Sequence, residues 1–203
     1  MKNIGLFFGT FNPIHVGHLI IANYMTSRAE LDEVWLVVTP QNPLKDKQTL
    51  LSDYHRLAIV QTAIEKNDKL KVSDIEFKMS QPNYTIDTLV RLKEKHPNFR
   101  FHLIIGEDNL RNFHKWKNAE IIQKNYSIFV YPRVLTPQEL KNETTFAMKN
   151  EIRSNPCFIY CDDAPLMKIS STYIREAIRT KKDVRYLLTE EVYNYVDEMN
   201  FYK

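Results

Sequence analysis

Short apolar runs alternate with helical patterns along almost the whole chain, and this alternation constrains the fold more than any other feature. The apolar runs suited to buried strands lie at Ile4–Phe8, Val34–Val38, Leu70–Val72, Phe101–Ile105, Ser127–Tyr131 and Phe158–Tyr160. The helical patterns lie at Leu19–Ala29, Tyr54–Lys66, Ile86–His96, Ala119–Lys124, Pro137–Asn150, Ser171–Thr180 and Thr189–Met199. Strands that alternate with helices form a mostly parallel sheet covered on both faces. The sequence therefore predicts a doubly wound α/β fold with helices at its C-terminal end.

Length and composition narrow the class of protein. The chain has 203 residues, enough for one α/β domain and too few for two, so we expect a single domain over residues 1–203. Apolar residues make up 43% of the chain, which does not fit disorder, and no stretch approaches the ~20 apolar residues of a membrane span. The net charge of +3 is weak evidence for a nucleic-acid partner. We expect neither a membrane nor a nucleic acid as partner.

The two cysteines and the N-terminus indicate a cytoplasmic protein. Cys157 and Cys161 are four residues apart, which in a strand places them on one face but roughly 13 Å apart, too far for a disulfide. No His or Cys pair accompanies them at a zinc spacing. The segment Met1–Pro13 has one lysine and a short apolar run without a small-residue cleavage site, which favours a first strand over a signal peptide.

The scarcity of glycine limits the kinds of nucleotide site that can be present. The only glycines are Gly5, Gly9, Gly17 and Gly106, so neither G-x-G-x-x-G nor G-x-x-x-x-G-K-[ST] can be written. Gly9 follows the first predicted strand and Gly106 follows the fourth. Ligands of such sheets bind beyond the carboxyl ends of the strands, where the strand order reverses. The loops after these two strands are therefore the predicted binding site.

The segment Gly9–His18 joins the first strand to a helix that is expected to start near Gly17. Gly9 permits a tight turn and a close approach of the backbone to a ligand, and the helix start directs free N–H groups into the same space. His15 and His18 are three residues apart and share one side of a helix start. Two imidazoles beside helix amides suit a polyphosphate, to which they donate hydrogen bonds more strongly when protonated.

Two other interpretations of the histidines stay open at this point. Paired histidines often bind zinc, although a spacing of three with no neighbouring carboxylate argues against a metal site, and we expect none. The histidines can also be ordinary helix-start residues that backbone groups satisfy.

Two motifs at opposite ends of the chain give a family resemblance. The segment His15–His18 resembles the H-x-G-H signature of the nucleotidyltransferase superfamily, which class I aminoacyl-tRNA synthetases share. The segment Ile169–Arg175 resembles the second phosphate-binding motif of that superfamily, I-S-S-T-x-I-R. Ser170 or Ser171 can cap a helix whose amides face a phosphate, and Arg175 adds a fixed charge one turn later. A Ser-Ser-Thr helix start alone is an ordinary cap, but the pair of motifs is specific.

Within the superfamily the chain most resembles the bacterial nicotinate-nucleotide adenylyltransferases over nearly its whole length. The supporting segments are Gly9–His18, Pro40–Lys45, Tyr84–Leu89, Ile105–Asp108, His114–Trp116, Ile169–Arg175 and Tyr186–Val192. Two positions depart from the family pattern. Phe8 stands where a second glycine is common, and Tyr131-Pro132-Arg133 lacks a following glycine, which leaves the role of Arg133 open.

The resemblance implies a Rossmann-like nucleotidyltransferase fold and the transfer of AMP from ATP to nicotinate mononucleotide, a step of NAD biosynthesis. The 5′-phosphate attacks the α-phosphorus in line and pyrophosphate leaves, so catalysis needs positioning and charge stabilisation rather than a protein nucleophile. The implied catalytic residues are His15 and His18. The implied ATP site consists of Gly9, Thr10, Phe11, Gly106, Asp108, Ser170, Ser171, Thr172 and Arg175. Asp108 would accept a ribose hydroxyl; capping a helix from Asn109 onward is the alternative, and one residue can serve both roles.

The mononucleotide site that the resemblance implies consists of Asn12, Lys45, Tyr84, Thr85, Trp116 and Arg133. Trp116 would stack on the pyridine ring, and backbone donors around Tyr84 and Thr85 would receive its carboxylate. A packed structural Trp116 and a solvated Lys45 are the alternatives.

The expected partners and the alternative functions follow from the same family resemblance. Mg²⁺ is expected to arrive with ATP, because the sequence has no visible carboxylate cluster. The sequence leaves the oligomeric state open, and a homo-oligomer is one of the alternatives. Nicotinamide mononucleotide and phosphopantetheine are the alternative substrates. A catalytically silent nucleotide-binding regulator and a tRNA-linked role are the alternative functions.

Overall fold

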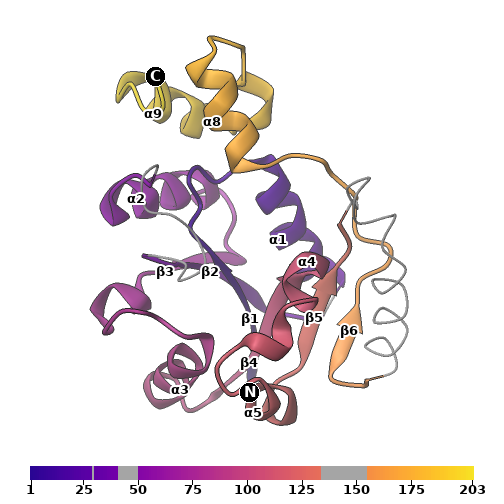
Figure 1. Ribbon diagram of the computed structural model, residues 1–203. Helices are drawn as coiled ribbons and strands as arrows, with labels where there is room; N and C mark the ends of the chain where they lie inside the picture. Colours follow the sequence, from indigo (N-terminus) through magenta and orange to yellow (C-terminus); the bar gives the residue numbers. More distant parts are fainter. Residues whose placement is uncertain (29, 41–49, 134–154) are drawn as a thin grey trace.

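Figure 1 shows a computed structural model, which describes residues 1–28, 30–40, 50–133 and 155–203. The six strands are β1 (Lys2–Gly9), β2 (Glu33–Val38), β3 (Leu70–Ser73), β4 (Phe99–Gly106), β5 (Ile128–Tyr131) and β6 (Phe158–Tyr160). They form one sheet in the order β3-β2-β1-β4-β5-β6, and every neighbouring pair is parallel. All six strands predicted from the apolar runs are confirmed.

The helices connect these strands in the predicted alternation. They are α1 (Val16–Arg28), α2 (Asp53–Ile64), α3 (Thr85–Lys95), α4 (Glu107–Leu110), α5 (Ala119–Asn125), α8 (Ser171–Arg179) and α9 (Glu190–Glu198), with short 3-10 turns η1 (Ile75–Lys78), η2 (Phe113–Lys115) and η3 (Arg185–Leu187). The four short elements η1, α4, η2 and η3 have too few residues to show a periodic pattern in the sequence. The predicted helix at Pro137–Asn150 lies outside the described residues.

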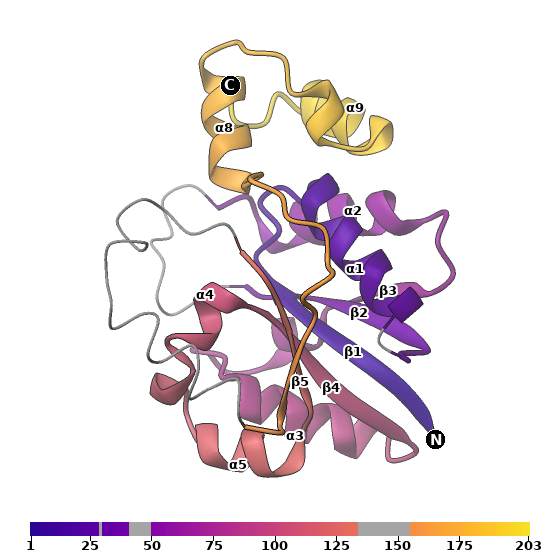
Figure 2. The same ribbon diagram turned by 90° about the vertical axis from the view of Figure 1, so that its right-hand side faces the viewer.

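The sheet has an apolar core on each face because successive side chains of a strand point in opposite directions. In β1, Ile4 and Leu6 lie in the core formed with α3, α4 and α5, whereas Phe7 lies in the core formed with α1, α2, α8 and α9. Figure 2 shows these helix groups on either side of the sheet. None of the helices described by the structure is long and apolar enough to cross a membrane.

The strand order reverses between β1 and β4. From this pair the chain proceeds to β2 and β3 on one side and to β5 and β6 on the other. The helices α8 and α9 stand beside each other beyond α1 and α2 in Figure 1, and Val192 and Val196 of α9 join the core with α2. The structure thus confirms that the strand order reverses at β1 and β4, whose following loops are the predicted binding site.

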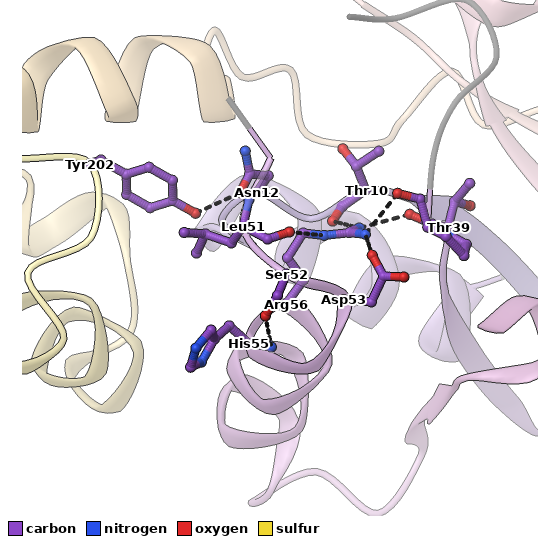
Figure 3. Close-up of polar contacts among 10 residues, drawn as sticks. Thr10, Asn12, Thr39, Leu51, Ser52, Asp53, His55, Arg56 and Tyr202 are labelled. Atoms are coloured by element: carbon purple, nitrogen blue, oxygen red, sulfur yellow. Dashed lines mark hydrogen bonds and ion pairs between the residues drawn. The ribbon is translucent and has the colours of Figure 1, made fainter. Parts of the chain in front are cut away.

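Arg56 of α2 ties together the loops that follow β1 and β2 (Figure 3). Its side chain is fully buried, with 0% of the residue exposed. The guanidinium donates to the backbone carbonyls of Thr10 (2.7 Å), Thr39 (2.7 Å), Pro40 (2.9 Å) and Leu51 (3.1 Å), and it also pairs with the carboxylate of Asp53. A planar group with five N–H donors can satisfy this many oxygens at once, which no other side chain can do.

We expect Arg56→Lys to lower the free energy of unfolding by about 2–4 kcal/mol, because an ammonium leaves several buried carbonyls without a donor. Urea unfolding at pH 7.5 measures the change. The control is Arg91→Lys on the exposed side of α3, which should shift the free energy by no more than about 0.5 kcal/mol. Equal effects of the two substitutions would contradict the role given to Arg56.

Candidate active site

The loop from β1 to α1 is shaped by Phe11 and Gly9. Phe11 has a positive φ of 45° and no glycine has one, so the left-handed residue of this turn is Phe11. The Phe11 ring is 2% exposed and folds back under the strand end. A Cβ at Gly9 would lie 2.8 Å from this ring. Gly9 is therefore required for close packing of the loop.

His15 and His18 meet at the start of α1. The carbonyl of His15 accepts the N–H groups of His18 (2.9 Å) and Leu19 (3.3 Å), so the helix begins at Val16. The two imidazole rings stack with centroids 3.8 Å apart. The backbone N–H of His15 donates to Nδ1 of His18 at 3.3 Å. In neutral His18 the proton therefore resides on Nε2, which is the nitrogen that can donate to a phosphate.

His15 is a buried, neutral imidazole. Only 5% of the residue is exposed, and burial, helped by the positive charge of Arg133, lowers its pKa from 6.5 to about 4. Its Nδ1 is buried and has no hydrogen-bond partner among the described residues. Burial therefore favours the neutral form of His15 at neutral pH, which is the weaker of the two donors considered from the sequence.

The second motif packs directly against this loop. Ser170 is the N-cap of α8 and its hydroxyl accepts the N–H of Tyr173 at 3.2 Å, which settles the choice of cap between Ser170 and Ser171. Ser171 instead donates through Oγ to the carbonyl of Pro13 at 2.9 Å. The N-termini of α1 and α8 are therefore held near one loop, as two phosphate sites of one ligand require.

Arg175 completes the contact between the two motifs. Its Nη1 donates to the carbonyl of Asn12 at 2.8 Å, and its Nη2 lies 3.4 Å from Oγ1 of Thr172. Thr172 stands on the first turn of α8 and is exposed, and Arg175 follows at the start of the next turn. Their contacts with phosphate stay predictions.

Asp108 and Arg133 form an ion pair at the ends of β4 and β5. Arg133 Nη1 lies 2.6 Å from Asp108 Oδ2. The other oxygen, Oδ1, is buried without a partner in the described chain, and a Cβ at Gly106 would lie 2.4 Å from it. Gly106 is the N-cap of α4, which begins at Glu107, so the alternative that Asp108 caps a helix is wrong. Oδ1 offers an acceptor of the kind that a ribose hydroxyl needs.

A second group of predicted residues lies around the start of α3. Tyr84 is its N-cap and makes no side-chain hydrogen bond to the helix, and the first N–H groups of a helix have no partner within it. Lys117 Nζ lies 2.9 Å from Asp87 and 4.8 Å from the centre of the Tyr84 ring. The neighbouring Trp116 is half-buried and packs 5.1 Å from Phe113. The structure thus brings Tyr84, Thr85 and Trp116 into one region.

Glu76 connects the start of α3 to the loop after β2. It is 2% exposed, accepts the Thr88 hydroxyl at 2.7 Å, and burial raises its pKa despite hydrogen bonds from Thr88 and Thr39. The N–H of Thr39 in turn donates to the carbonyl of Gly9 at 2.9 Å. Through Glu76 and Thr39, these contacts connect the start of α3 at Tyr84 to the loop after β1.

Two further members of the predicted mononucleotide site are Lys45 and Asn12. Lys45 lies outside the described residues. Asn12 is 1% exposed, and its Oδ1 accepts the N–H of Leu51 at 3.2 Å and the hydroxyl of Tyr202 at 2.8 Å (Figure 3). Its side-chain oxygen holds the loop, and contact with a mononucleotide stays a prediction.

Sequence reasoning missed three residues of this region: Arg56, Glu76 and Lys117. Arg56 and Glu76 are charged residues in segments with no motif, and a charge in such a place usually faces solvent. Lys117 adjoins Trp116, so a charge beside the proposed stacking residue was the one available signal. Among the described residues, no group of three or more His, Cys, Asp or Glu could hold a metal ion.

The lowered pKa of His15 predicts a pH-dependent contribution to stability. The unfolded chain takes up a proton below pH 6.5 that the folded chain does not take up until about pH 4, so stability falls as the pH falls through this window. The free energy of unfolding of the parent chain should therefore fall by about 2 kcal/mol between pH 6.5 and pH 5, because each pH unit costs about 1.4 kcal/mol. His15→Gln should not show this loss when the pH is lowered from 7.5 to 5. Urea unfolding at both pH values tests this, with His114→Gln at an exposed position as control. Parallel pH curves for parent and His15→Gln would disprove it.

Comparison with known proteins agrees with this geometry. The model of the cytidylyltransferase-like family matches residues 6–177. A probable nicotinate-nucleotide adenylyltransferase of Flavobacterium psychrophilum is 54% identical over 98% of this chain and 98% of its own length. One from Bacteroides fragilis is 45% identical over 93% of this chain and 88% of its own.

Solved structures confirm the fold. The nicotinic acid mononucleotide adenylyltransferase of Plasmodium falciparum, complexed with NaAD, matches with a TM-score of 0.76 at 20% identity and covers 100% of this chain and 98% of its own. A putative nicotinate-nucleotide adenylyltransferase of Vibrio parahaemolyticus matches with a TM-score of 0.69 at 22% identity, covering 100% of this chain and 96% of its own. The starts of α1 and α8 meet at one loop, the family model covers most of the chain, and the relatives match it over nearly its full length. The chain therefore belongs to the cytidylyltransferase-like family and, within it, to the nicotinate-nucleotide adenylyltransferases.

Proposed function

We propose that the chain transfers the adenylyl group of ATP to nicotinate mononucleotide, giving nicotinate adenine dinucleotide and pyrophosphate. The observation that carries this proposal is the meeting of the N-termini of α1 and α8 at one loop, with His15, His18 and Arg175 beside it. Helix N-termini and cationic donors are what a triphosphate binds. The family membership supports the same reaction.

The chemistry is an in-line displacement at the α-phosphorus of ATP. A 5′-phosphate oxygen of the mononucleotide forms the new P–O bond, the bond to the bridging oxygen breaks, and pyrophosphate leaves with the electron pair. Nε2–H of His18 and the amides of α1 stabilise charge on the reacting phosphates, and α8 with Arg175 holds the outgoing ones. His15 acts as a neutral donor, which binds phosphate without the cost of a buried charge.

ATP would bring Mg²⁺ with it, and the ion would neutralise part of the phosphate charge. The nearest carboxylate of the site, Asp108, is already paired with Arg133, so its free oxygen suits a ribose hydroxyl better than a cation. We place the reaction in the cytoplasm, a proposal that rests on the two free cysteines Cys157 and Cys161.

The pyridine ring and its carboxylate are expected to bind at the start of α3. The N–H groups of Thr85 and Ile86 lie in the first turn, where a helix favours negative charge. The ammonium of Lys117 pairs with Asp87 in the same turn. A nicotinate carboxylate fits these donors. The half-buried Trp116 supplies a flat apolar surface for the ring.

His18→Ala should lower kcat by ~10²-fold or more, the scale of deleting one charge-stabilising donor, while the fold is retained. Pyrophosphate release from ATP and nicotinate mononucleotide measures turnover, and circular dichroism checks the fold. The matched control is His96→Ala, which removes an imidazole at the C-cap of α3, at the far end of that helix. Full turnover in folded His18→Ala would refute the mechanism, and a parent chain that releases no pyrophosphate would refute the function.

The chain should prefer nicotinate mononucleotide to nicotinamide mononucleotide by at least ~10²-fold in kcat/KM. An amide presents an NH₂ group to the N–H donors of α3, so a buried donor loses its partner at about 1–3 kcal/mol and the charge assistance is lost as well. Side-by-side rates at fixed ATP measure the preference. Comparable efficiencies would overturn the nicotinate assignment and leave adenylyl transfer intact.

A further inference from the structure

The penultimate residue of the chain makes a hydrogen bond to the loop that precedes His15. The hydroxyl of Tyr202 donates to Asn12 Oδ1 at 2.8 Å, across 190 positions of sequence (Figure 3). Burial raises the pKa of this phenol, so the hydroxyl stays a donor at neutral pH. The family motifs in this sequence end well before Tyr202, and the mechanism above makes no use of it.

Asn12 is the point through which this bond can affect the reaction. It is 1% exposed and lies three positions before His15. Its side-chain oxygen also accepts the N–H of Leu51, and its carbonyl accepts Arg175 Nη1. Leu51 before α2, Arg175 of α8 and Tyr202 therefore all contribute contacts that fix the conformation of this one residue.

The C-terminal segment is itself fixed in place, which gives Tyr202 a defined position. The N–H of Phe201 donates to the carbonyl of Val196 at 3.0 Å, and the Phe201 ring lies 4.8 Å from that of His55. Tyr202 has a positive φ of 64°, a conformation that a bulky residue rarely adopts without support from its surroundings. The backbone thus holds the ring in a direction that brings its hydroxyl to Asn12.

We propose that Tyr202 is a positioning residue for adenylyl transfer, whose hydroxyl fixes Asn12 and thereby the alignment of His15 and the first amides of α1. The inference rests on the proposed function for its kinetic consequence. Alignment matters most in the transition state, where a misplacement of about 1 Å costs up to ~10²-fold in rate. Loss of one of the hydrogen bonds to Asn12 should therefore lower kcat and leave substrate binding nearly unchanged.

The test compares Tyr202→Phe with Tyr195→Phe. Tyr195 is a matched control because its hydroxyl lies 3.1 Å from His55 Nδ1 in the same C-terminal cluster, and within the described chain it makes no hydrogen bond to the β1 loop. Each substitution removes one hydroxyl and keeps the ring. We expect Tyr202→Phe to lower kcat by ~10-fold, with both KM values within ~2-fold, and Tyr195→Phe to keep kcat within ~2-fold. Equal kcat values in the two variants, or a fall that only follows a lower Tm, would overturn the proposal.

A measurement without turnover separates this inference from the proposed function. In protein labelled with ¹⁵N-histidine, Tyr202→Phe should shift the ring resonances of His15 and His18, whereas Tyr195→Phe should shift those of His55. Unchanged His15 and His18 resonances in Tyr202→Phe would refute the positioning role even if the parent chain proved inactive. Failure of the proposed function would show instead as the absence of pyrophosphate release by the parent chain.

Discussion

The arrangement of the site depends on the buried guanidinium of Arg56. Loops after parallel strands end with carbonyl groups that no strand partner satisfies, and four of these oxygens face Arg56. A buried positive charge is costly unless hydrogen bonds surround it, so the guanidinium and the carbonyls require one another. This mutual requirement fixes Thr10 and Thr39 next to each other and so sets the position of the β1 loop that leads to His15.

The second constraint comes from the opposite end of the chain. Ser171, Arg175 and Tyr202 all bind the two residues Asn12 and Pro13. The loop therefore has supports from α2 on one side and from α8 and the C-terminus on the other. Rigid support of this kind suits a reaction without a protein nucleophile, since its rate depends on the placement of donors around phosphate oxygens. A loop held at so many backbone atoms pre-organises those donors before substrate arrives.

Burial also sets the charges of the site. Desolvation keeps His15 neutral, and it raises the pKa of Glu76 behind the start of α3. Positive charge comes instead from Arg175, Arg133 and Lys117, whose side chains are partly or fully exposed. Two of these cations are paired with carboxylates, Arg133 with Asp108 and Lys117 with Asp87, while the buried polar groups serve as hydrogen-bond donors and acceptors of fixed geometry.

The sequence by itself determined the order and type of the main elements, because buried parallel strands are continuous apolar runs and the helices between them keep their own period. It also singled out Gly9–His18 and Ile169–Arg175, whose residue types and spacing predict phosphate binding. It did not reveal Arg56, the bond from Tyr202 to Asn12, the neutral state of His15 or the left-handed turn at Phe11. Each of these depends on which distant groups surround a side chain once it is buried, and only the tertiary structure decides that.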